Sequence, residues 1–517
     1  MPSQAGGSMG DVSAQGGASV TRPLTKGPSR REFLRAGGLL AGAVGLPGLM
    51  AACSAGDTPP TGSGAGKGKG TVRFWTIPEG PDDATFQRQQ IDGFMKRNPD
   101  VTVEAQFFPS AEQYGNAMQL AFTGGRDAPD IFRGNTASGV GLRSVKQRGW
   151  IRPITEFVTD DFKSRFPDWV YDAKHSALFI DKEAYAVPQV DPAVQAVRML
   201  YYNVDVLERF GFGEPPGTWS QMREMASKIT RDGGGKVYGM ALIGTSLPIV
   251  LVLQNLAGPQ SYKEDAQPPI SLLTGKPAMS EPSVIETIEL LQGMHSDNVF
   301  APGWQTWSTQ VFQQMAAGRL GMYLGPLFHV KQLRRANPKL KLGIAPPPVP
   351  DSGRRGSRAP ADDVLGWWMM SAEVRNPEAA WRVLDFLGSV DYQREAFQKQ
   401  KQISVMDKVY EGIEIDADTK RIREIASQIV RVHPDPYKKD QKAAKFYQDL
   451  VTNAPRPIPP QRYLEAITKG SNVRDMAAQY DEKLAAAIAK QLPTSGLHDM
   501  SAFTFHDWDP LTDYKQA

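Results

Sequence analysis

The sequence alternates short apolar segments with longer segments in which apolar residues recur at a helical period. Strands are predicted at 72–77 and 101–108, with a helix at 85–97 between them. Ser110 begins a second helix with a capping-box pattern, and a short buried strand follows at 131–132. This strand–helix–strand–helix–strand order predicts a parallel sheet covered by helices on both faces.

The same alternation begins again further along the chain. Strand-like segments recur at 185–188 and 198–203, and Thr218 is placed to cap a helix whose buried face carries Met222, Met225, Ala226 and Ile229. Another helix is predicted after Asn376-Pro377, and most of 393–517 has a helical pattern. At about 150 residues per domain, 517 residues predict two to four domains, and two α/β lobes fit this pattern.

The charged and metal-binding residues exclude several classes of protein. Lys and Arg total 59 against 56 Asp and Glu, a balance of +3 that is too weak for a nucleic-acid-binding surface. Residues 1–52 account for this excess, so the rest of the chain is neutral. A single cysteine excludes an intrachain disulfide or a cysteine-ligated metal site. The six histidines show no ligand spacing, so we expect no metal and no cofactor.

The N-terminal segment has the features of an export signal and a lipid anchor. Arg30-Arg31 precedes the uncharged run 36–52, which resembles a twin-arginine export signal. Cys53 follows small residues, as in a bacterial lipobox, although Met50 stands where leucine is usual. We therefore expect a signal peptide at 1–52, acylation of Cys53, a flexible linker at 53–70, and attachment to the outer face of the cytoplasmic membrane. The alternatives are an uncleaved membrane anchor and an inert buried thiol.

Six segments together resemble one protein family. The central ones are 184–188, 200–207 and 215–219, and the supporting ones are 124–131, 312–322 and 376–381. In this order and spacing they resemble the extracellular solute-binding proteins of the maltose-binding-protein class, which capture ligands for ABC importers.

The resemblance implies a two-lobed, type II periplasmic-binding-protein-like α/β fold. Each lobe would be a mostly parallel sheet flanked by helices, with a ligand cleft between the lobes. The predicted domains are lobe one at 71–190 plus 350–390, and lobe two at 193–345 plus 391–517. The chain would cross between them near Asp191-Pro192 and near 345–350. The protein would be a monomer that captures a neutral oligosaccharide by hinge closure and delivers it to an ABC permease.

A sugar site needs aromatic rings for the C–H faces and polar side chains for the hydroxyls. Trp304 and Trp307 lie in a segment bounded by Pro and Gly, where ligand stacking and core packing are equally expected. Trp367 and Trp368 are consecutive on a predicted strand, so at most one of them can face a cleft. The complete set of candidate ligand contacts, several carried over from the resemblance, is Glu79, Asp82, Arg133, Asn135, Asp191, Gln195, Trp304, Trp307, Phe328, Gly366, Trp367, Trp368 and Tyr463.

Three alternatives remain open at this point. The chain could bind a non-sugar solute such as a glycerol phosphate, a polyol or a peptide on the same fold. It could be a secreted carbohydrate-active enzyme, although no catalytic motif selects a pair among its 56 acidic residues. It could also be a lipid-anchored adhesion or scaffold protein, which would bind no small solute.

Overall fold

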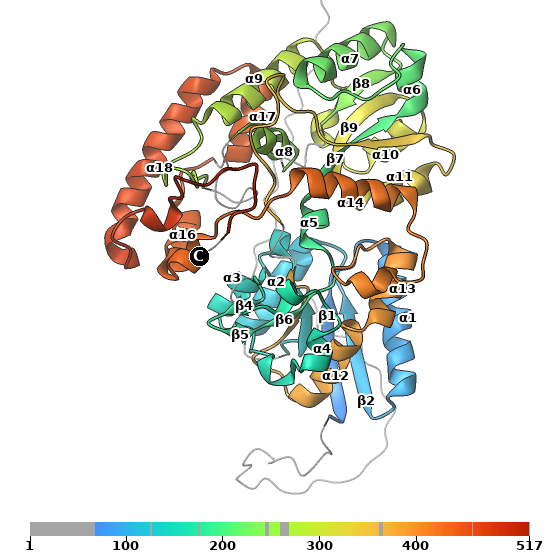
Figure 1. Cartoon of the computed structure of the whole chain (residues 1–517), viewed down its shortest axis with the longest axis vertical. Coiled ribbons are helices and arrows are strands. Elements are labelled where there is room, and N and C mark those ends of the chain that lie inside the picture. The colour runs from blue at the N-terminus through green and yellow to red at the C-terminus, as the bar shows by residue number, and fades with distance from the viewer. Residues whose placement is uncertain are drawn as a thin grey trace, which may run out of the picture. The chain divides into compact units, whose positions relative to one another are not determined.

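The computed structural model describes residues 68–515, with gaps at 125–126, 174–175, 243–247, 259–267, 361–364 and 458. The described residues all belong to one compact unit (Figure 1). Arg30, Arg31 and Cys53 lie outside the described residues, so the export signal and the lipid anchor stay predictions.

The first sheet has the strand order β2-β1-β3-β11-β6. Its strands are β1 Gly70–Thr76, β2 Val101–Phe107, β3 Ile131–Arg133, β6 Ala186–Val187 and β11 Trp368–Met370. The predicted parallel β1, β2 and β3 are confirmed, but β11 pairs antiparallel with both β3 and β6. The difference arises because β11 enters this sheet from the other lobe, so no right-handed crossover fixes its direction.

Helices cover this sheet, and the first three of them in chain order lie where the sequence predicted them. They are α1 Pro81–Arg97, α2 Ala111–Thr123, α12 Pro377–Leu387 and α13 Val390–Gln400. The Ser110 side chain accepts a hydrogen bond from the Gln113 amide, and Asn376 caps α12 in the same way through Ala379. Between β3 and β6 lie the short elements α3 Leu142–Gln147, α4 Asp160–Lys163, β4 Phe179–Ile180, β5 Glu183–Ala184, η1 Thr136–Ser138, η2 Thr155–Phe157 and η3 Asp168–Tyr171.

The second sheet has the order β10-β7-β9-β8, with β7 Arg198–Asn203, β8 Tyr238–Ala241, β9 Leu320–Pro326 and β10 Leu342–Ala345. Only β8 and β9 run parallel, so the expectation of a mostly parallel sheet is wrong for this lobe. The difference lies in β7, which enters this sheet from the first sheet and runs antiparallel to both of its neighbours, β9 and β10. The two-lobed α/β class itself is confirmed.

The helices around the second sheet are α6 Val204–Arg209, α7 Trp219–Asp232, α8 Pro248–Ala257, α9 Pro282–Ser296, α10 Gln310–Ala316 and α11 His329–Ala336, with the short turn η4 Trp304–Thr306. The predicted helix after Thr218 is confirmed as α7. Both hydrogen bonds of its capping box with Gln221 are present, and it buries Met222 and Met225.

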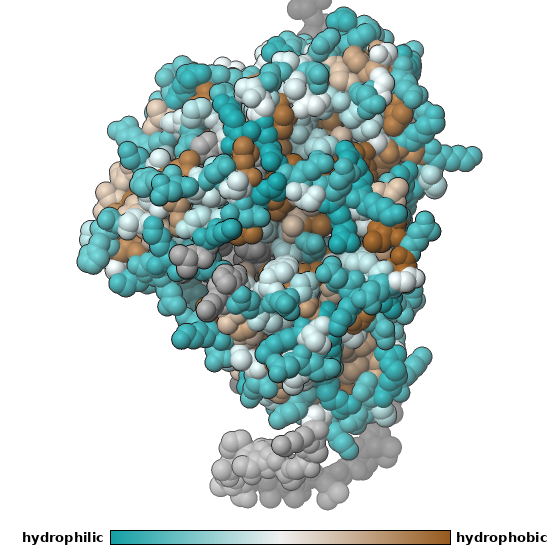
Figure 2. Space-filling model, in the orientation of Figure 1, coloured by the Kyte–Doolittle hydropathy of each residue, from teal (hydrophilic) through white to brown (hydrophobic). Residues whose placement is uncertain are grey.

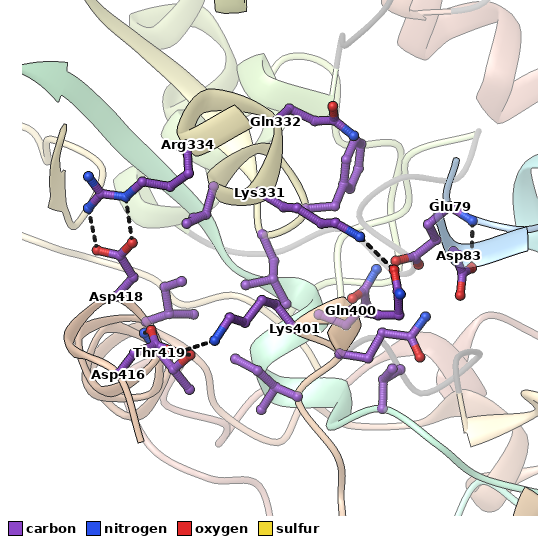
Figure 3. Close-up of a pocket in the computed structure, with 18 of the residues that line it drawn as sticks. Glu79, Asp83, Lys331, Gln332, Arg334, Gln400, Lys401, Asp416, Asp418 and Thr419 are labelled. Carbon is purple, nitrogen blue, oxygen red and sulfur yellow. Dashed lines mark hydrogen bonds and ion pairs between the residues drawn. The ribbon is translucent and has the colours of Figure 1, made fainter. Parts of the chain in front are cut away.

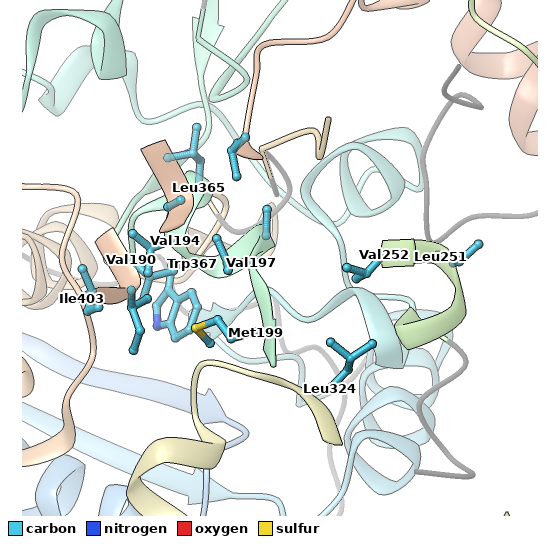
Figure 4. Close-up of a cluster of buried hydrophobic side chains, with 14 of the residues drawn as sticks. Val190, Val194, Val197, Met199, Leu251, Val252, Leu324, Leu365, Trp367 and Ile403 are labelled. Atoms are coloured by element: carbon cyan, nitrogen blue, oxygen red, sulfur yellow. The ribbon is translucent and has the colours of Figure 1, made fainter. Parts of the chain in front are cut away.

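Three passages connect the two sheets. The first runs from β6 through α5 (Pro192–Ala196) to β7, and the second runs from β10 to β11. Val190, Val194 and Val197 of the first passage lie with Trp367 in a cluster of buried hydrophobic side chains (Figure 4). A third, which the predicted lobe limits placed at 390–391, runs from α13 to α14 (Ala417–Ile429). The limits predicted for the two lobes stay predictions, but the position of helix α13 differs from them. Helix α13 packs against α1 and α12, although its residues from 391 onward were assigned to lobe two.

The C-terminal region is helical, as predicted. It contains α15 Pro436–Lys439, α16 Lys442–Asn453, α17 Pro459–Lys469 and α18 Val473–Ser495, together with η6 Asp407–Tyr410 before α14 and η7 Ser501–Phe503 near the end. Helices α17 and α18 pack against α9. Figure 2 shows hydrophilic residues over most of one face of the molecule, with apolar residues scattered among them.

Candidate functional site

Two adjoining cavities lie at the carboxyl ends of β1 and β3, next to the segment that follows β9. The smaller has a volume of about 360 Å³ and is lined by Ile77, Pro78, Glu79, Arg133, Gly134, Asn135, Thr136, Gln195, Phe328 and Trp367. Glu79, Arg133, Asn135, Gln195, Phe328 and Trp367 are candidate contacts from the sequence, and the structure brings these six together. The first sheet with the loops that follow it, the segment after β9 and the first passage between the lobes all contribute to this lining.

The larger cavity has a volume of about 470 Å³ (Figure 3). Glu79, Gln195 and Phe328 line it as well, so these three residues stand where the two cavities meet. The rest of its wall comes from Asp83, Val190, α11 with the residues before it, 400–403, and the first turns of α14. Both cavities have the size of ordinary small-molecule sites.

Arg133 is the buried centre of the smaller cavity, with 5% of its surface exposed. Its Nη2 donates to Glu79 Oε1 at 3.1 Å, and its Nη1 donates to the Ile77 carbonyl. The guanidinium carbon lies 3.9 Å from the centre of the Trp367 ring. Because the guanidinium covers that ring face, Trp367 supports Arg133 and cannot offer the same face to a ligand.

Glu79 is held by groups from three elements. Burial raises the pKa of its carboxyl above the usual value, and the Asp83 carboxylate acts in the same direction, while Arg133 and Lys331 oppose the rise. The backbone N–H of Glu79 donates to Asp83 Oδ2 at 2.8 Å, which fixes the loop between β1 and α1.

Phe328 is the exposed aromatic residue of the site. It follows β9 directly and keeps 46% of its surface exposed. A phenyl ring left in water at the junction of two cavities is available for contact with an apolar ligand face.

The charged side chains around the larger cavity are paired with one another. Arg334 donates to both carboxylate oxygens of Asp418 at 3.0 Å, and Lys401 donates to Asp416 at 2.8 Å (Figure 3). Lys331 donates to Gln400 Oε1 at 2.5 Å. Each of these three cations therefore has an acceptor within the protein, and the two ammonium groups keep further N–H donors.

Comparison with known proteins assigns the family. The model of the bacterial extracellular solute-binding protein family matches residues 78–394, more than half of the chain. The chain belongs to this family. It is thus a solute-binding protein of the kind that serves ABC importers. Among the described residues, no helix is long and apolar enough to cross a membrane.

Relatives and solved structures agree with this assignment. A putative binding protein of Brucella abortus is 27% identical over 372 residues, which are 70% of this chain and 79% of the relative. The maltotriose-binding protein of Pyrococcus abyssi is 23% identical over 61% of this chain and 62% of its own length. The GacH receptor of Streptomyces glaucescens, solved unliganded and with acarbose, has the same fold, with a TM-score of 0.59 and 17% identity over 81% of this chain and 99% of its own.

Four candidate aromatic residues of this solute-binding protein line neither cavity. Trp304 is 4% exposed and packs on Phe300, with ring centres 5.5 Å apart. Trp307 is half-buried against the same core. Trp368 is fully buried on the opposite side of its strand from Trp367 and donates to Gln189 at 2.8 Å. Tyr463 is buried in α17.

Three other candidates have structural partners near the site. Asp82 forms an ion pair with Arg335 of α11. Asp191 caps α5 by accepting hydrogen bonds from the amides of Ala193 and Val194. The Gly366 carbonyl lies so close to Gly134 that a Cβ atom on Gly134 would stand 2.0 Å from its oxygen.

The residues of α11, 400–403 and α14 that line the larger cavity were not among the contacts predicted from the sequence. A helical run such as 329–336, with Lys331, Arg334 and Arg335, has the pattern of an ordinary solvated face. No group of three or more histidine, cysteine or acidic residues in the described part could hold a metal ion.

Proposed function

We propose that this solute-binding protein captures a carbohydrate, specifically a neutral oligosaccharide, between its lobes and delivers it to an ABC permease. The observation that carries the proposal is the junction of the two cavities. There an exposed ring, Phe328, stands beside the hydrogen-bonding side chains of Glu79, Asn135 and Gln195. Sugars require this combination of an apolar surface and polar groups.

Hinge closure follows from the origin of these groups. Glu79 and Asn135 belong to lobe one, Phe328 belongs to lobe two, and Gln195 lies on the passage between them. A ligand that contacts all of them makes its full set of contacts only when the lobes are close together. It therefore stabilises the closed state by its differential affinity.

The names of relatives support a sugar over other solutes. One relative is named for maltotriose, and solved structures of the same fold contain acarbose or maltose. Another relative, from Pectobacterium atrosepticum, is named for sn-glycerol-3-phosphate, which makes a phosphorylated solute the alternative to be tested.

The remaining parts of the proposal concern chemistry and location. The protein acts by binding without turnover, and it works as a monomer. The Arg30-Arg31 signal directs its export from the cytoplasm. Acylated Cys53 then anchors it to the outer face of the cytoplasmic membrane. Replacing Cys53 by serine should abolish labelling by a radioactive fatty acid and release the protein from the membrane fraction.

A thermal-shift screen of the purified protein tests the binding proposal. The panel contains mono- and oligosaccharides, polyols, glycerol phosphates, peptides and polyamines. A ligand at 100 times its Kd should stabilise the folded state by about 2.7 kcal/mol. Stabilisation by neutral oligosaccharides, with the sugar recovered unchanged, is the expected result. Stabilisation by glycerol phosphate alone, turnover of the sugar, or no response to any solute would each contradict the proposal.

A further inference from the structure

Glu79 has a position that no other charged residue of the two linings shares. Of the three residues that line both cavities in the described part of the chain, Gln195 and Phe328 are uncharged and Glu79 is acidic. Its side chain is 29% exposed, so the carboxylate is in contact with whatever occupies the junction.

The charges around the junction do not favour a second anion. In the smaller cavity, the charged lining residues are Glu79 and Arg133, which balance. In the larger cavity, three cations face four carboxylates: Lys331, Arg334 and Lys401 against Glu79, Asp83, Asp416 and Asp418. An anionic ligand group at the junction would add a like charge beside Glu79 in a partly dehydrated site, where charges interact more strongly than in water.

The nearby cations already have partners within the protein. The terminal nitrogens of Arg133 donate to Glu79 and to the Ile77 carbonyl, and its flat face lies on Trp367. Lys331 donates to Gln400 and lies 3.8 Å from an Asp82 oxygen. A carboxylate or phosphate at the junction would therefore share these cations with acceptor groups of the protein, Glu79 among them.

We propose that Glu79 determines the charge class of the ligand, because it accepts hydrogen bonds from an uncharged polyhydroxylated segment at the junction and repels a carboxylate or phosphate there. This inference rests on the proposed carbohydrate function. A carboxylate can accept hydrogen bonds from several hydroxyls, and these charge-assisted bonds are stronger than those between neutral groups. The same group thus provides both the attraction to a neutral sugar and the discrimination against a charged one.

Matched ligands and the variant Glu79→Gln test this role. Each neutral oligosaccharide that binds in the screen is compared with two singly charged forms, one carrying a carboxylate at the reducing end and one at the other end. Isothermal titration at low salt should show wild-type protein binding the neutral form at least about tenfold more tightly than either charged form. In Glu79→Gln this ratio should fall below about threefold, because the unbalanced Arg133 then attracts an anion.

Asp100→Asn is the control variant. It removes a carboxylate that is likewise paired with an arginine, Arg382, but at the opposite end of β2 from the cavities. It should leave the neutral-to-charged ratio unchanged. A ratio that stays the same in Glu79→Gln, or that falls equally in Asp100→Asn, overturns the inference. If no sugar binds the wild-type protein, the proposed function itself is refuted, and this is a separate outcome.

Titration of the wild-type protein gives a second test that needs no variant. Besides Arg133, the charged groups facing Glu79 are Asp83 from α1 and Lys331 from α11. Because the pKa of Glu79 lies above its usual value, its carboxyl takes up a proton before a sugar carboxylate of ordinary pKa does as the pH falls. The discrimination should therefore weaken on acidification in wild type and not in Glu79→Gln. Equal pH dependence in both proteins contradicts the role of Glu79.

Discussion

Replacing Phe328 and Trp304 separately should distinguish an aromatic residue that contacts the ligand from one that supports the fold. Both are candidates from the sequence, but the structure exposes 46% of Phe328 and only 4% of Trp304. We expect Phe328→Ala to weaken sugar binding with little loss of stability. We expect Trp304→Ala to reduce stability while folded molecules bind normally.

The magnitudes follow from burial. Truncating a buried tryptophan to alanine costs about 3–5 kcal/mol, a large share of the roughly 5–15 kcal/mol that stabilises an ordinary domain. Phe328 is about half exposed, so its removal should cost about 1 kcal/mol of folding free energy or less. Loss of an aromatic contact with the ligand should cost about 1.4 kcal/mol, a tenfold rise in Kd.

Urea unfolding and isothermal titration measure the two effects independently. Trp304→Phe is included because it keeps most of the buried volume if Trp304→Ala does not fold. A Trp304→Phe protein of nearly wild-type stability that has lost sugar affinity would refute the placement of Trp304 in the core. Unchanged affinity in Phe328→Ala would refute the stacking role.

Three further predictions concern stability. Gly134→Ala should lower the free energy of unfolding by about 1–3 kcal/mol in urea, because its Cβ would meet a backbone carbonyl, whereas Gly213→Ala meets nothing within 4 Å and should be nearly neutral. Asn376→Ala removes the cap of α12 and should cost about 1 kcal/mol by the same measurement. Burial, with the nearby charge of Arg358, lowers the pKa of His433 to about 3. The unfolded chain therefore binds this proton first, and stability should fall as pH drops below 6.5, by at most about 1.4 kcal/mol per pH unit for this group. His433→Asn should flatten that dependence in melts between pH 7 and 5, and an unchanged slope would contradict the assignment.

The sequence predicts local structure well where pattern and capping agree. Thr218 begins a helix whose methionines are spaced for one buried face, and both features are present in α7, where Gln221 completes a capping box. Strand direction was less predictable, because β11 pairs with β3 only after the chain has returned from the other lobe. Such a pairing depends on contacts that are remote in sequence.

The candidate site, too, was predictable from the sequence only in part. Arg133 is the last residue of β3, Asn135 lies just after it, and Glu79 lies in the loop after β1. The ends of adjacent parallel strands meet at one sheet edge, so the proximity of these three residues was predictable. The contribution of Lys331 and Lys401 was not predictable, because only packing between the lobes brings them to the larger cavity. Tryptophans presented a different difficulty, because core packing and ligand stacking leave the same local pattern.

The passages between the lobes limit how the cleft can open. Arg358, on the second passage, is 2% exposed. Its amide donates to the Ile429 carbonyl at the end of α14, beyond the third passage, and its Nε donates to the Ala196 carbonyl on the first. Because the backbone and side chain of one buried residue join these segments, they cannot flex independently near it without breaking hydrogen bonds in the interior. The larger cavity is lined by Val190 and Gln195 of the first passage and by 400–403 at the start of the third. A ligand there therefore contacts the connecting segments as well as both lobes, so its binding energy can act on the lobe angle directly.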